Sequence, residues 1–328
     1  MQGNDGYLHS YFVLDKAEER FTWLENSHEL YCFGHFMQAA VAHHRVTGEA
    51  RLLNVAKRLG DFLDKTFGPA DEGKIENTDG HQEIEMALVE LARETGEERY
   101  LKLAQFFVEV RKPGVPIANP HFPALGSRYD QSHEPLREQS EAVGHAVRAV
   151  YFYCAATDLV TETDDEELRA AMERLWQNVT RRKMYISGGI GARHGSEAFG
   201  DDYELPNATS YCETCAAIGL VMWSWRLLQL TGEARFADIL ERALYNAVLP
   251  GLSLSGDRYF YDNPLESDGS KARQEWFGCA CCPPNIARLL AQLPGYFCSI
   301  GDNEVWLHLY AQSTLKIAMQ NGAATLDV

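Results

Sequence analysis

The stretch Thr47-Gly48-Glu49-Ala50-Arg51-Leu52 separates two long segments in which apolar residues recur at helical spacing. Closely similar stretches return at residues 95–100 and 231–236, and a looser version lies at residues 161–166. In each, a glycine or polar cluster suits the end of one helix, and an acidic turn suits the start of the next. Helical hairpins with a recurring turn must stack to bury their apolar faces. The sequence therefore predicts a fold of stacked helical hairpins.

The helices expected on either side of these turns cover most of the chain. A short extended piece is expected before them at residues 7–13, and strands are expected after them at residues 305–310 and 314–318. The predicted helices span residues 28–46, 50–67, 81–94, 98–111, 138–158, 165–183, 213–230, 234–248 and 284–299. The predicted class is therefore all-α, with the start of a β region near the C-terminus.

Two arrangements bury the faces of such hairpins: an open solenoid, or a closed ring of inner and outer helices. The recurring turns are unevenly spaced, and the longest loops contain His, Glu, Tyr and Gly. Loops of that size in a compact domain are usually functional. The pattern favours an α/α toroid whose long loops converge on one mouth.

Composition limits the classes of partner. The chain has 328 residues, 45% of them hydrophobic, and a formal net charge of -17, which argues against nucleic acid or an anionic membrane as a partner. No apolar run is long enough to span a bilayer, and the first residues lack the apolar core of a signal peptide. Clustered cysteines without a secretory signal fit a reducing compartment, so we expect a cytoplasmic protein.

Five of the eight cysteines fall in two short runs, Tyr211-Cys212-Glu213-Thr214-Cys215 and Gly278-Cys279-Ala280-Cys281-Cys282-Pro283-Pro284-Asn285. Thiolates and carboxylates are ligands of tetrahedral zinc. Pro283 and Pro284 suit the start of a helix. The dipole of that helix would favour thiolates at the two cysteines just before it. The sequence predicts a four-ligand site made of Glu213, Cys215, Cys281 and Cys282.

Local geometry adds two expectations for these ligands. Glu213 and Cys215 are two residues apart, so they point the same way on an extended segment and apart on a helix. Cys282 precedes a proline, which disfavours the helical region for that residue. Disulfides, buried structural cysteines and a purely structural zinc are the alternatives. The other cysteines of apolar runs are expected in the core: Cys32, Cys154 and Cys298.

The loop at residues 184–212 is glycine-rich, but it lacks the GxGxxG pattern after a strand, which argues against a nucleotide site. It carries Glu197 shortly before the first cysteine run. A carboxyl group near a metal–thiolate centre can serve as general acid and base. A solvated loop glutamate is the alternative. Three neighbouring acids compete for the role, although a charge run is more often solvated: Asp201, Asp202 and Glu204.

Three histidines, His28, His81 and His145, lie at or near helix starts in successive hairpins. In an α/α toroid the N-terminal ends of the inner helices surround the pocket, so we expect these rings to contact a ligand. A capping or core role is the alternative for each one singly. Four other histidines are expected to be surface or packing residues: His43, His44, His121 and His133.

Several motifs carry a resemblance to a known family, in order along almost the whole chain. They are Gly80-His81-x-Glu83-Ile84-Glu85, Glu141-Ala142-Val143-Gly144-His145-Ala146-Val147-Arg148, Gly188-Gly189-Ile190-Gly191, Glu197, Cys212-Glu213-Thr214-Cys215 and Cys281-Cys282-Pro283-Pro284-Asn285. Together they resemble glycoside hydrolase family 127, the β-L-arabinofuranosidases. The cysteine runs are the most specific part of the resemblance.

The resemblance implies an (α/α)6 barrel, zinc (Zn2+) as cofactor on the four ligands named above, and retaining hydrolysis that releases L-arabinofuranose. It implies Cys281 as nucleophile and Glu197 as acid/base. The residues that it implies for the sugar subsite are His28, His81, His145 and Tyr261. The implied partner is a small carbohydrate, an arabinofuranosyl glycan or glycopeptide.

Family members are longer than this chain, so we expect a catalytic barrel at residues 1–302 and the beginning of a truncated β-sandwich region at residues 303–328. Two alternatives differ in function class. One is another α/α-barrel carbohydrate hydrolase that uses carboxylates alone and holds zinc as a structural clip. The other is a non-catalytic barrel fragment that binds zinc and glycans. The sequence predicts no oligomeric state.

Overall fold

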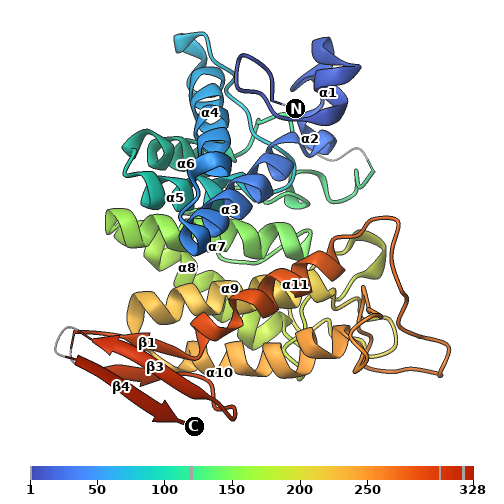
Figure 1. Cartoon of the computed structure of the whole chain (residues 1–328). Coiled ribbons are helices and arrows are strands. Elements are labelled where there is room, and N and C mark those ends of the chain that lie inside the picture. Colours follow the sequence, from blue (N-terminus) through green and yellow to red (C-terminus); the bar gives the residue numbers. More distant parts are fainter. Residues whose placement is uncertain (1, 118–120, 303, 320–321) are drawn as a thin grey trace. The chain divides into compact units, whose positions relative to one another are not determined.

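The computed structural model describes residues 2–117, 121–302, 304–319 and 322–328. Figure 1 shows a chain that is mostly helical, with strands near its C-terminus. It divides into two compact units. The first comprises Met1–Lys183 and Arg193–Glu204, and the second comprises Met184–Ala192 and Leu205–Val328.

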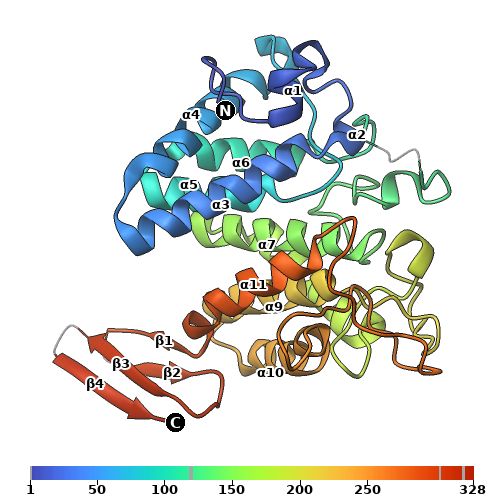
Figure 2. The ribbon, with the colours of Figure 1, turned by 45° about the vertical axis from the view of Figure 1, so that its right-hand side comes forward.

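The first unit is built from helical hairpins (Figure 2). Helix α5 (Ile84–Thr95) packs between α3 (Glu29–Thr47) and α7 (Ala146–Thr163), and each of these three pairs with the helix that follows it. Nearly every residue of α7 up to Val160 is buried, whereas α4, α6 and α8 bury one face each. Helix α7 is therefore enclosed on all sides, whereas the outer helices are amphipathic, as two helical layers require.

The helices of the first unit are α1 (Ser10–Leu14), α2 (Leu24–Ser27), α3 (Glu29–Thr47), α4 (Ala50–Thr66), α5 (Ile84–Thr95), α6 (Glu98–Val110), α7 (Ala146–Thr163) and α8 (Glu166–Asn178), with a π-helical turn at Val179–Lys183. Short 3-10 turns lie at Ala17–Glu19, Ala70–Glu72, Gly126–Arg128 and His194–Ser196.

The recurring turn of the sequence ends helices by one mechanism. Gly48, Gly96 and Gly232 have φ values of 73°, 71° and 70°, and each donates its amide to the carbonyl four residues earlier. Asp164, with φ 54°, occupies the same position in the looser fourth version. A left-handed residue after the last turn closes the helix and satisfies an otherwise unpaired carbonyl.

The second unit contains α9 (Thr214–Thr231), α10 (Ala234–Ala243) and α11 (Cys282–Gln292). Helix α9 is buried along most of its length and packs against both α10 and α11. Helix α10 continues as a π-helical turn at Leu244–Val248 and a 3-10 turn at Leu249–Gly251, and α11 as a 3-10 turn at Leu293–Tyr296.

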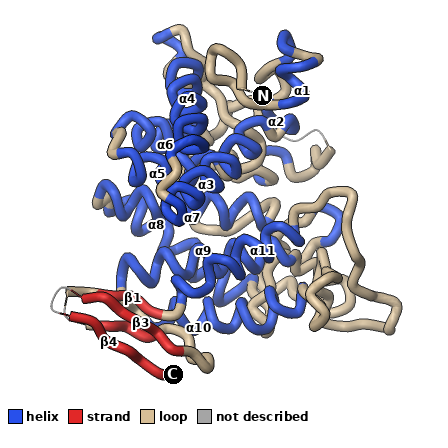
Figure 3. Tube along the Cα trace, viewed as in Figure 1, coloured by secondary structure: helices blue, strands red, loops and turns tan. Residues whose placement is uncertain are grey.

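The strands follow α11 and form two antiparallel hairpins, which Figure 3 shows in red. Strand β1 (Cys298–Ile300) pairs with β2 (Val305–Leu307), and Cys298 lies opposite Leu307. Strand β3 (Thr314–Met319) pairs with β4 (Gly322–Asp327), and Thr314 lies opposite Asp327. The predicted start of a β region is confirmed. The predicted boundary at residue 303 lies outside the described residues and stays a prediction.

Some element boundaries differ from the prediction. The helix expected from residue 138 begins at Ala146, because Gly144 is left-handed (φ 70°) and a Cβ there would lie 2.0 Å from the Arg128 carbonyl oxygen. An extended piece was expected at residues 7–13, but residues 10–14 form the helix α1. The last predicted helix is shorter, since residues 298–300 pair as β1.

Within the described ranges, none of the helices combines the length and apolarity needed to cross a bilayer.

Candidate functional site

Two helix starts in the second unit bring four metal-ligand side chains together. Glu213 is the N-cap residue of α9 and Cys215 lies in its first turn. Cys281 is the N-cap residue of α11 and Cys282 is its first residue. Because α9 and α11 pack against one another, both ligand pairs reach a common point. These ligand atoms all lie within 4.8 Å of one another.

The spacing of these atoms fits a tetrahedral metal site. The sulfur of Cys282 lies 3.4 Å from that of Cys215 and 3.7 Å from that of Cys281. Oε1 of Glu213 lies 3.5 Å from the Cys281 sulfur and 3.6 Å from the Cys282 sulfur. A tetrahedron with metal–sulfur bonds of about 2.3 Å has edges of about 3.8 Å. Three sulfurs and one carboxylate oxygen therefore have the chemistry and the spacing that zinc requires.

Both local expectations for the ligands need correction. Glu213 and Cys215 do not lie on one extended segment, because α9 begins at Thr214; an N-cap residue and a first-turn residue can still converge. Cys282 is helical although a proline follows it, since Pro283 occupies a first-turn position that needs no amide donor. The prolines do begin a helix, as predicted.

The cysteines of this cluster differ in how deeply they are buried. Cys215 and Cys282 are 2% and 0% exposed, whereas Cys281 is half-buried. Burial works to raise the pKa of Cys215, but hydrogen bonds from the thiols of Cys281 and Cys282 bring that pKa down to about 6. Burial, together with donation to Cys215, raises the pKa of Cys282. The Cys215 thiol therefore ionises more readily than the Cys282 thiol, and a bound cation would favour the thiolate form of a coordinating cysteine.

The remaining cysteines behave differently. Burial raises the pKa of Cys212 to about 12, and its backbone amide donates to the Gly191 carbonyl. Cys154 is buried as predicted, but Cys32 is exposed and Cys298 is half-buried in β1, so the core prediction was wrong for Cys32. An apolar run on an amphipathic helix does not by itself say which residue faces the core.

Tyr261 lies beside the half-buried sulfur. Its hydroxyl oxygen is 2.9 Å from the sulfur of Cys281. The segment that carries it pairs with the first ligand run: Thr214 donates its amide to the Tyr261 carbonyl at 2.8 Å, and Asp262 forms an antiparallel bridge with Glu213. This pairing fixes Tyr261 to the same backbone that supplies Glu213.

The three predicted histidines form a row in the first unit. The ring centroids of His28 and His81 are 5.8 Å apart, and those of His81 and His145 are 5.7 Å apart. His28 and His145 are the N-cap residues of α3 and α7, and His81 lies three residues before the start of α5 at Ile84. The inner helix starts therefore do converge on one cluster of rings, as the sequence indicated.

Two tyrosines that the sequence did not single out lie against this row. Tyr31 is 4.5 Å from His81 between ring centroids, and Tyr129 is 5.6 Å from His145. Tyr31 follows His28 by three residues, a helical spacing that could have identified it. Tyr129 lies in a loop and had no such signal.

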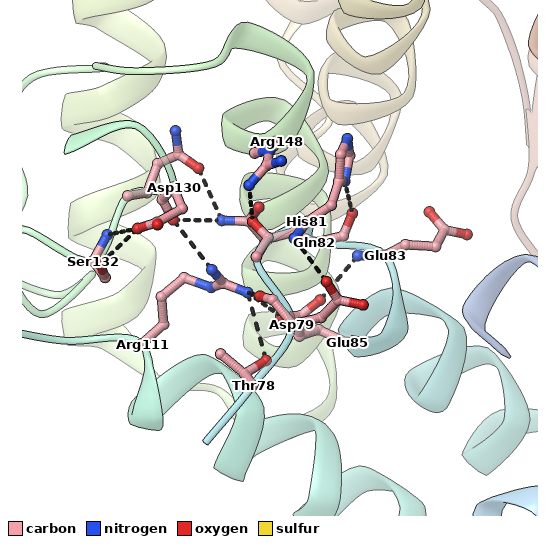
Figure 4. Close-up of polar contacts among 12 residues, drawn as sticks. Thr78, Asp79, His81, Gln82, Glu83, Glu85, Arg111, Asp130, Ser132 and Arg148 are labelled. Carbon is pink, nitrogen blue, oxygen red and sulfur yellow. Dashed lines mark hydrogen bonds and ion pairs between the residues drawn. The ribbon is translucent and has the colours of Figure 1, made fainter. Parts of the chain in front are cut away.

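A buried polar network holds the backbone around His81 (Figure 4). Asp79 accepts the amides of His81 and Tyr31 at 3.2 and 3.1 Å. Arg111, fully buried, donates to the carbonyls of Asp79 and Asp130 at 2.7 and 3.2 Å. Arg111 also pairs with the buried carboxylate of Glu85 at 3.4 Å, and since breaking a buried charge pair is costly, this network fixes the backbone before α5.

A second buried arginine reaches the same backbone from α7. Arg148 donates to the Gly80 carbonyl at 2.5 Å, and its guanidinium lies 4.7 Å from the ring centroid of Tyr129. Burial, and next the positive charge of Arg148, lower the pKa of His81 well below its usual value. Burial likewise lowers the pKa of His145. Both rings are therefore neutral near pH 7.

Glu197 lies against this row in the first unit. Its Oε2 is 2.8 Å from Nε2 of His145, and its carbonyl accepts the Ala146 amide at 2.9 Å. Its backbone is left-handed, with φ 55°, a conformation that costs a non-glycine residue about 1 kcal/mol. Strain of this kind is found at functional positions.

The acids that compete with Glu197 are engaged in ion pairs. Asp202 pairs with Arg182 at 2.5 Å and Glu204 with Arg193 at 2.6 Å, and hydrogen bonds from these arginines lower the pKa of both carboxyl groups. Asp201 is exposed and lies 3.2 Å from Arg193. A general acid needs a raised pKa, so the lowered pKa values of Asp202 and Glu204 argue against that role for them.

The chain was compared with families and relatives of known identity. The family model described as the catalytic domain of GH127 β-L-arabinofuranosidase matches residues 1–295. A non-reducing end β-L-arabinofuranosidase of Bifidobacterium longum subsp. longum is 39% identical, over 97% of this chain and 52% of that protein.

Solved structures agree. A GH127 β-L-arabinofuranosidase from Geobacillus stearothermophilus T6 superimposes with a TM-score of 0.95 at 41% identity, over 99% of this chain and 55% of that one. The structure of another GH127 β-arabinofuranosidase superimposes with a TM-score of 0.91 at 41% identity, over 99% of this chain and 51% of that one. The chain spans about half the length of these relatives. The predicted fold class is confirmed, and the chain belongs to the GH127 β-L-arabinofuranosidase family.

Proposed function

We propose that this chain is the catalytic part of a retaining, non-reducing end β-L-arabinofuranosidase with a cysteine nucleophile. The observation that carries the proposal is the group of three thiols and one carboxylate at tetrahedral spacing, with the most accessible thiol beside the Tyr261 hydroxyl. Family membership supplies the sugar: the relatives named above are arabinofuranosidases. The substrate proposed is an arabinofuranosyl glycan or glycopeptide. A cytoplasmic location stays a prediction.

Zinc is the metal that this donor set suits, held by Glu213, Cys215, Cys281 and Cys282. When bound, it would keep the Cys281 sulfur deprotonated at neutral pH, where a free thiol is mostly protonated. Cys281 suits the nucleophile's role better than Cys282, because Cys282 is fully buried and Cys281 is not. Once the Cys281 thiol is deprotonated, the Tyr261 hydroxyl, 2.9 Å away, would donate to that sulfur and orient it.

The reaction then has two steps. In the first, the Cys281 sulfur bonds to the anomeric carbon while the bond to the leaving oxygen breaks, and Glu197 gives its proton to that oxygen. In the second, Glu197 takes a proton from water, whose oxygen bonds to the anomeric carbon as the carbon–sulfur bond breaks. Two inversions retain the configuration, with sulfur in place of the usual carboxylate nucleophile.

Sugar binding falls to His28, His81 and Tyr261. Imidazole nitrogens and a phenol hydroxyl exchange hydrogen bonds with hydroxyl groups. This suits a furanose, which offers hydroxyl groups and no charge.

The test combines metal analysis with turnover of p-nitrophenyl β-L-arabinofuranoside by the chain as it stands. About one zinc per chain is expected from the four ligands. The Cys281→Ser variant should lose turnover while keeping part of its metal, and Cys212→Ser is the matched control, because that buried thiol is no ligand. Zinc-loaded protein that keeps its activity after Cys281→Ser would instead use carboxylates alone. Protein without turnover on any aryl pentoside would refute the enzymatic proposal.

A further inference from the structure

The proton positions on the three histidines follow from their hydrogen-bond partners. Nδ1 of His28 lies 2.8 Å from the Asn26 carbonyl oxygen, and Nδ1 of His81 lies 2.8 Å from the Gln82 carbonyl oxygen. A carbonyl can only accept, so each Nδ1 must carry a proton. In a neutral ring the other nitrogen, Nε2, then has the lone pair and can accept a proton from a hydroxyl group.

His145 has the opposite arrangement. The backbone amides of Val147 and Arg148 donate to its Nδ1 at 3.2 and 3.4 Å, as an N-cap side chain requires. Amides can only donate, so Nδ1 has the lone pair and the proton of the neutral ring lies on Nε2. Burial and the positive charge of Arg148 both lower the pKa of His145 and favour this neutral ring, although the bond to Glu197 works against them.

We propose that His145 is a positioning residue for Glu197: its Nε2 proton is donated to Oε2, across 2.8 Å, and so fixes where Glu197 carries its own proton. The inference rests on the proposed function, in which Glu197 is the acid/base. In a protonated carboxyl group the carbonyl oxygen is the better acceptor. With Oε2 accepting from His145, the transferable proton therefore sits on Oε1.

The backbone holds this pair in register. Ala146 donates its amide to the Glu197 carbonyl, and Phe199 donates to the Gly144 carbonyl, both at 2.9 Å. His145 and Ala198 form the antiparallel bridge between these two bonds. The segment that caps α7 is thus paired through its backbone with the loop that carries Glu197, which keeps the two side chains next to each other.

A neutral donor is the suitable partner for a general acid. A permanent cation hydrogen-bonded to Glu197 would favour the carboxylate and lower the pKa of the acid. A neutral imidazole orients the carboxyl group with a weaker effect of that kind. The three rings therefore have different roles: His28 and His81 accept hydrogen bonds from sugar hydroxyl groups, and His145 donates a hydrogen bond to Glu197.

The proton assignment can be tested without turnover. Nitrogen-15 spectra of the side-chain imidazoles in the purified protein distinguish the two neutral tautomers, and single His→Asn variants assign the signals. We expect the proton on Nε2 in His145 and on Nδ1 in His28 and His81. A His145 ring protonated on Nδ1 would overturn the inference, whether or not the protein hydrolyses arabinosides.

The role can be tested with a variant that separates the two bonds of His145. In His145→Asn the shorter side chain still caps α7 through Oδ1 but cannot reach Glu197. We expect an almost unchanged melting temperature and a loss of about 10²-fold or more in kcat with an alkyl leaving group, as for a general acid. The loss with p-nitrophenol as leaving group should be much smaller.

His81→Asn is the matched control, since it should slow both substrates by the same factor and act mainly on KM. The double variant with Glu197→Gln should be no slower than Glu197→Gln alone, because both changes disable one unit. Equal loss on both substrates from His145→Asn, additive with Glu197→Gln, would make His145 a sugar contact and refute the positioning role. Wild-type protein inactive on both substrates would refute the proposed function instead, and the imidazole spectra alone would then decide the tautomer.

Discussion

A cysteine in this chain takes its chemistry from the backbone position that holds it. Cys212 and Cys215 are three residues apart and both buried, yet burial raises the pKa of Cys212 to about 12, while donated thiol protons bring that of Cys215 down to about 6. Cys215 lies in the first turn of α9, where other thiols can reach it, and Cys212 does not. Position within a helix start therefore matters more here than depth of burial.

Tyr261→Phe tests the hydrogen bond to the proposed nucleophile. The ring should keep its place, because it packs 5.4 Å from Phe277 and 6.3 Å from Tyr211 between centroids. Loss of one hydrogen bond to a charged sulfur is worth about 1.5–3 kcal/mol, so kcat/KM should fall by about 10- to 100-fold with little change in melting temperature. Tyr259→Phe, in the same loop but packed on Trp276, is the control. Equal kinetics for both variants would remove Tyr261 from the mechanism.

Single residues show where sequence reasoning stops. The four cluster residues could be predicted, since ligand chemistry and clustering are visible in the sequence. Arg111 could not, because its partners are the carbonyls of Asp79 and Asp130, which only the folded chain brings together. The exposure of Cys32 was missed for the same reason: it depends on how α3 is turned against its neighbours.

At the scale of the helices, the hairpins were predictable because a similar left-handed turn joins the two helices of each one. The start of α7 was not, since the apolar pattern runs on through Gly144 while the backbone there is left-handed and closely packed. The sequence pattern shows which residues are apolar, but it contains no information about a backbone conformation that a neighbouring carbonyl imposes. The same limit hid β1, whose pairing with β2 overrides the helical pattern before it.

Gly96→Ala tests the turn between α5 and α6. A Cβ at Gly96 would meet nothing within 4 Å, so any loss of stability comes from the left-handed backbone alone. We expect the free energy of unfolding to fall by about 1 kcal/mol, measured by urea denaturation. Gly295→Ala is the matched control: it also has open space, without a left-handed φ, and should be neutral or slightly stabilising. Similar losses in both variants would mean that contacts rather than conformation set the cost.

At the scale of the whole molecule, stability should depend on pH through the buried histidines. The pKa values of His81 and His145 are lowered in the folded chain, mainly by burial, so the unfolded chain binds more protons below about pH 6.5. The stability that the neutral rings provide is full above that pH and is lost as the pH falls through it. The melting temperature should therefore drop between about pH 7 and pH 5, and drop less in His81→Gln. An unchanged slope in that variant would assign the acid sensitivity to other groups.

The cysteine cluster also makes the chain sensitive to oxidation. The sulfurs of Cys215 and Cys282 lie 3.4 Å apart, and a disulfide needs about 2.05 Å, so a small movement would join them. A bound cation holds both as ligands and blocks that reaction, but a metal-free chain exposed to a peroxide loses two electrons and closes the bond. The oxidised chain would keep its helices but could not bind zinc at this cluster. A thiol reductant would have to reduce the disulfide before a metal could bind again. Exposure of the metal-free chain to an oxidant is thus a route to inactivation that only a reductant reverses.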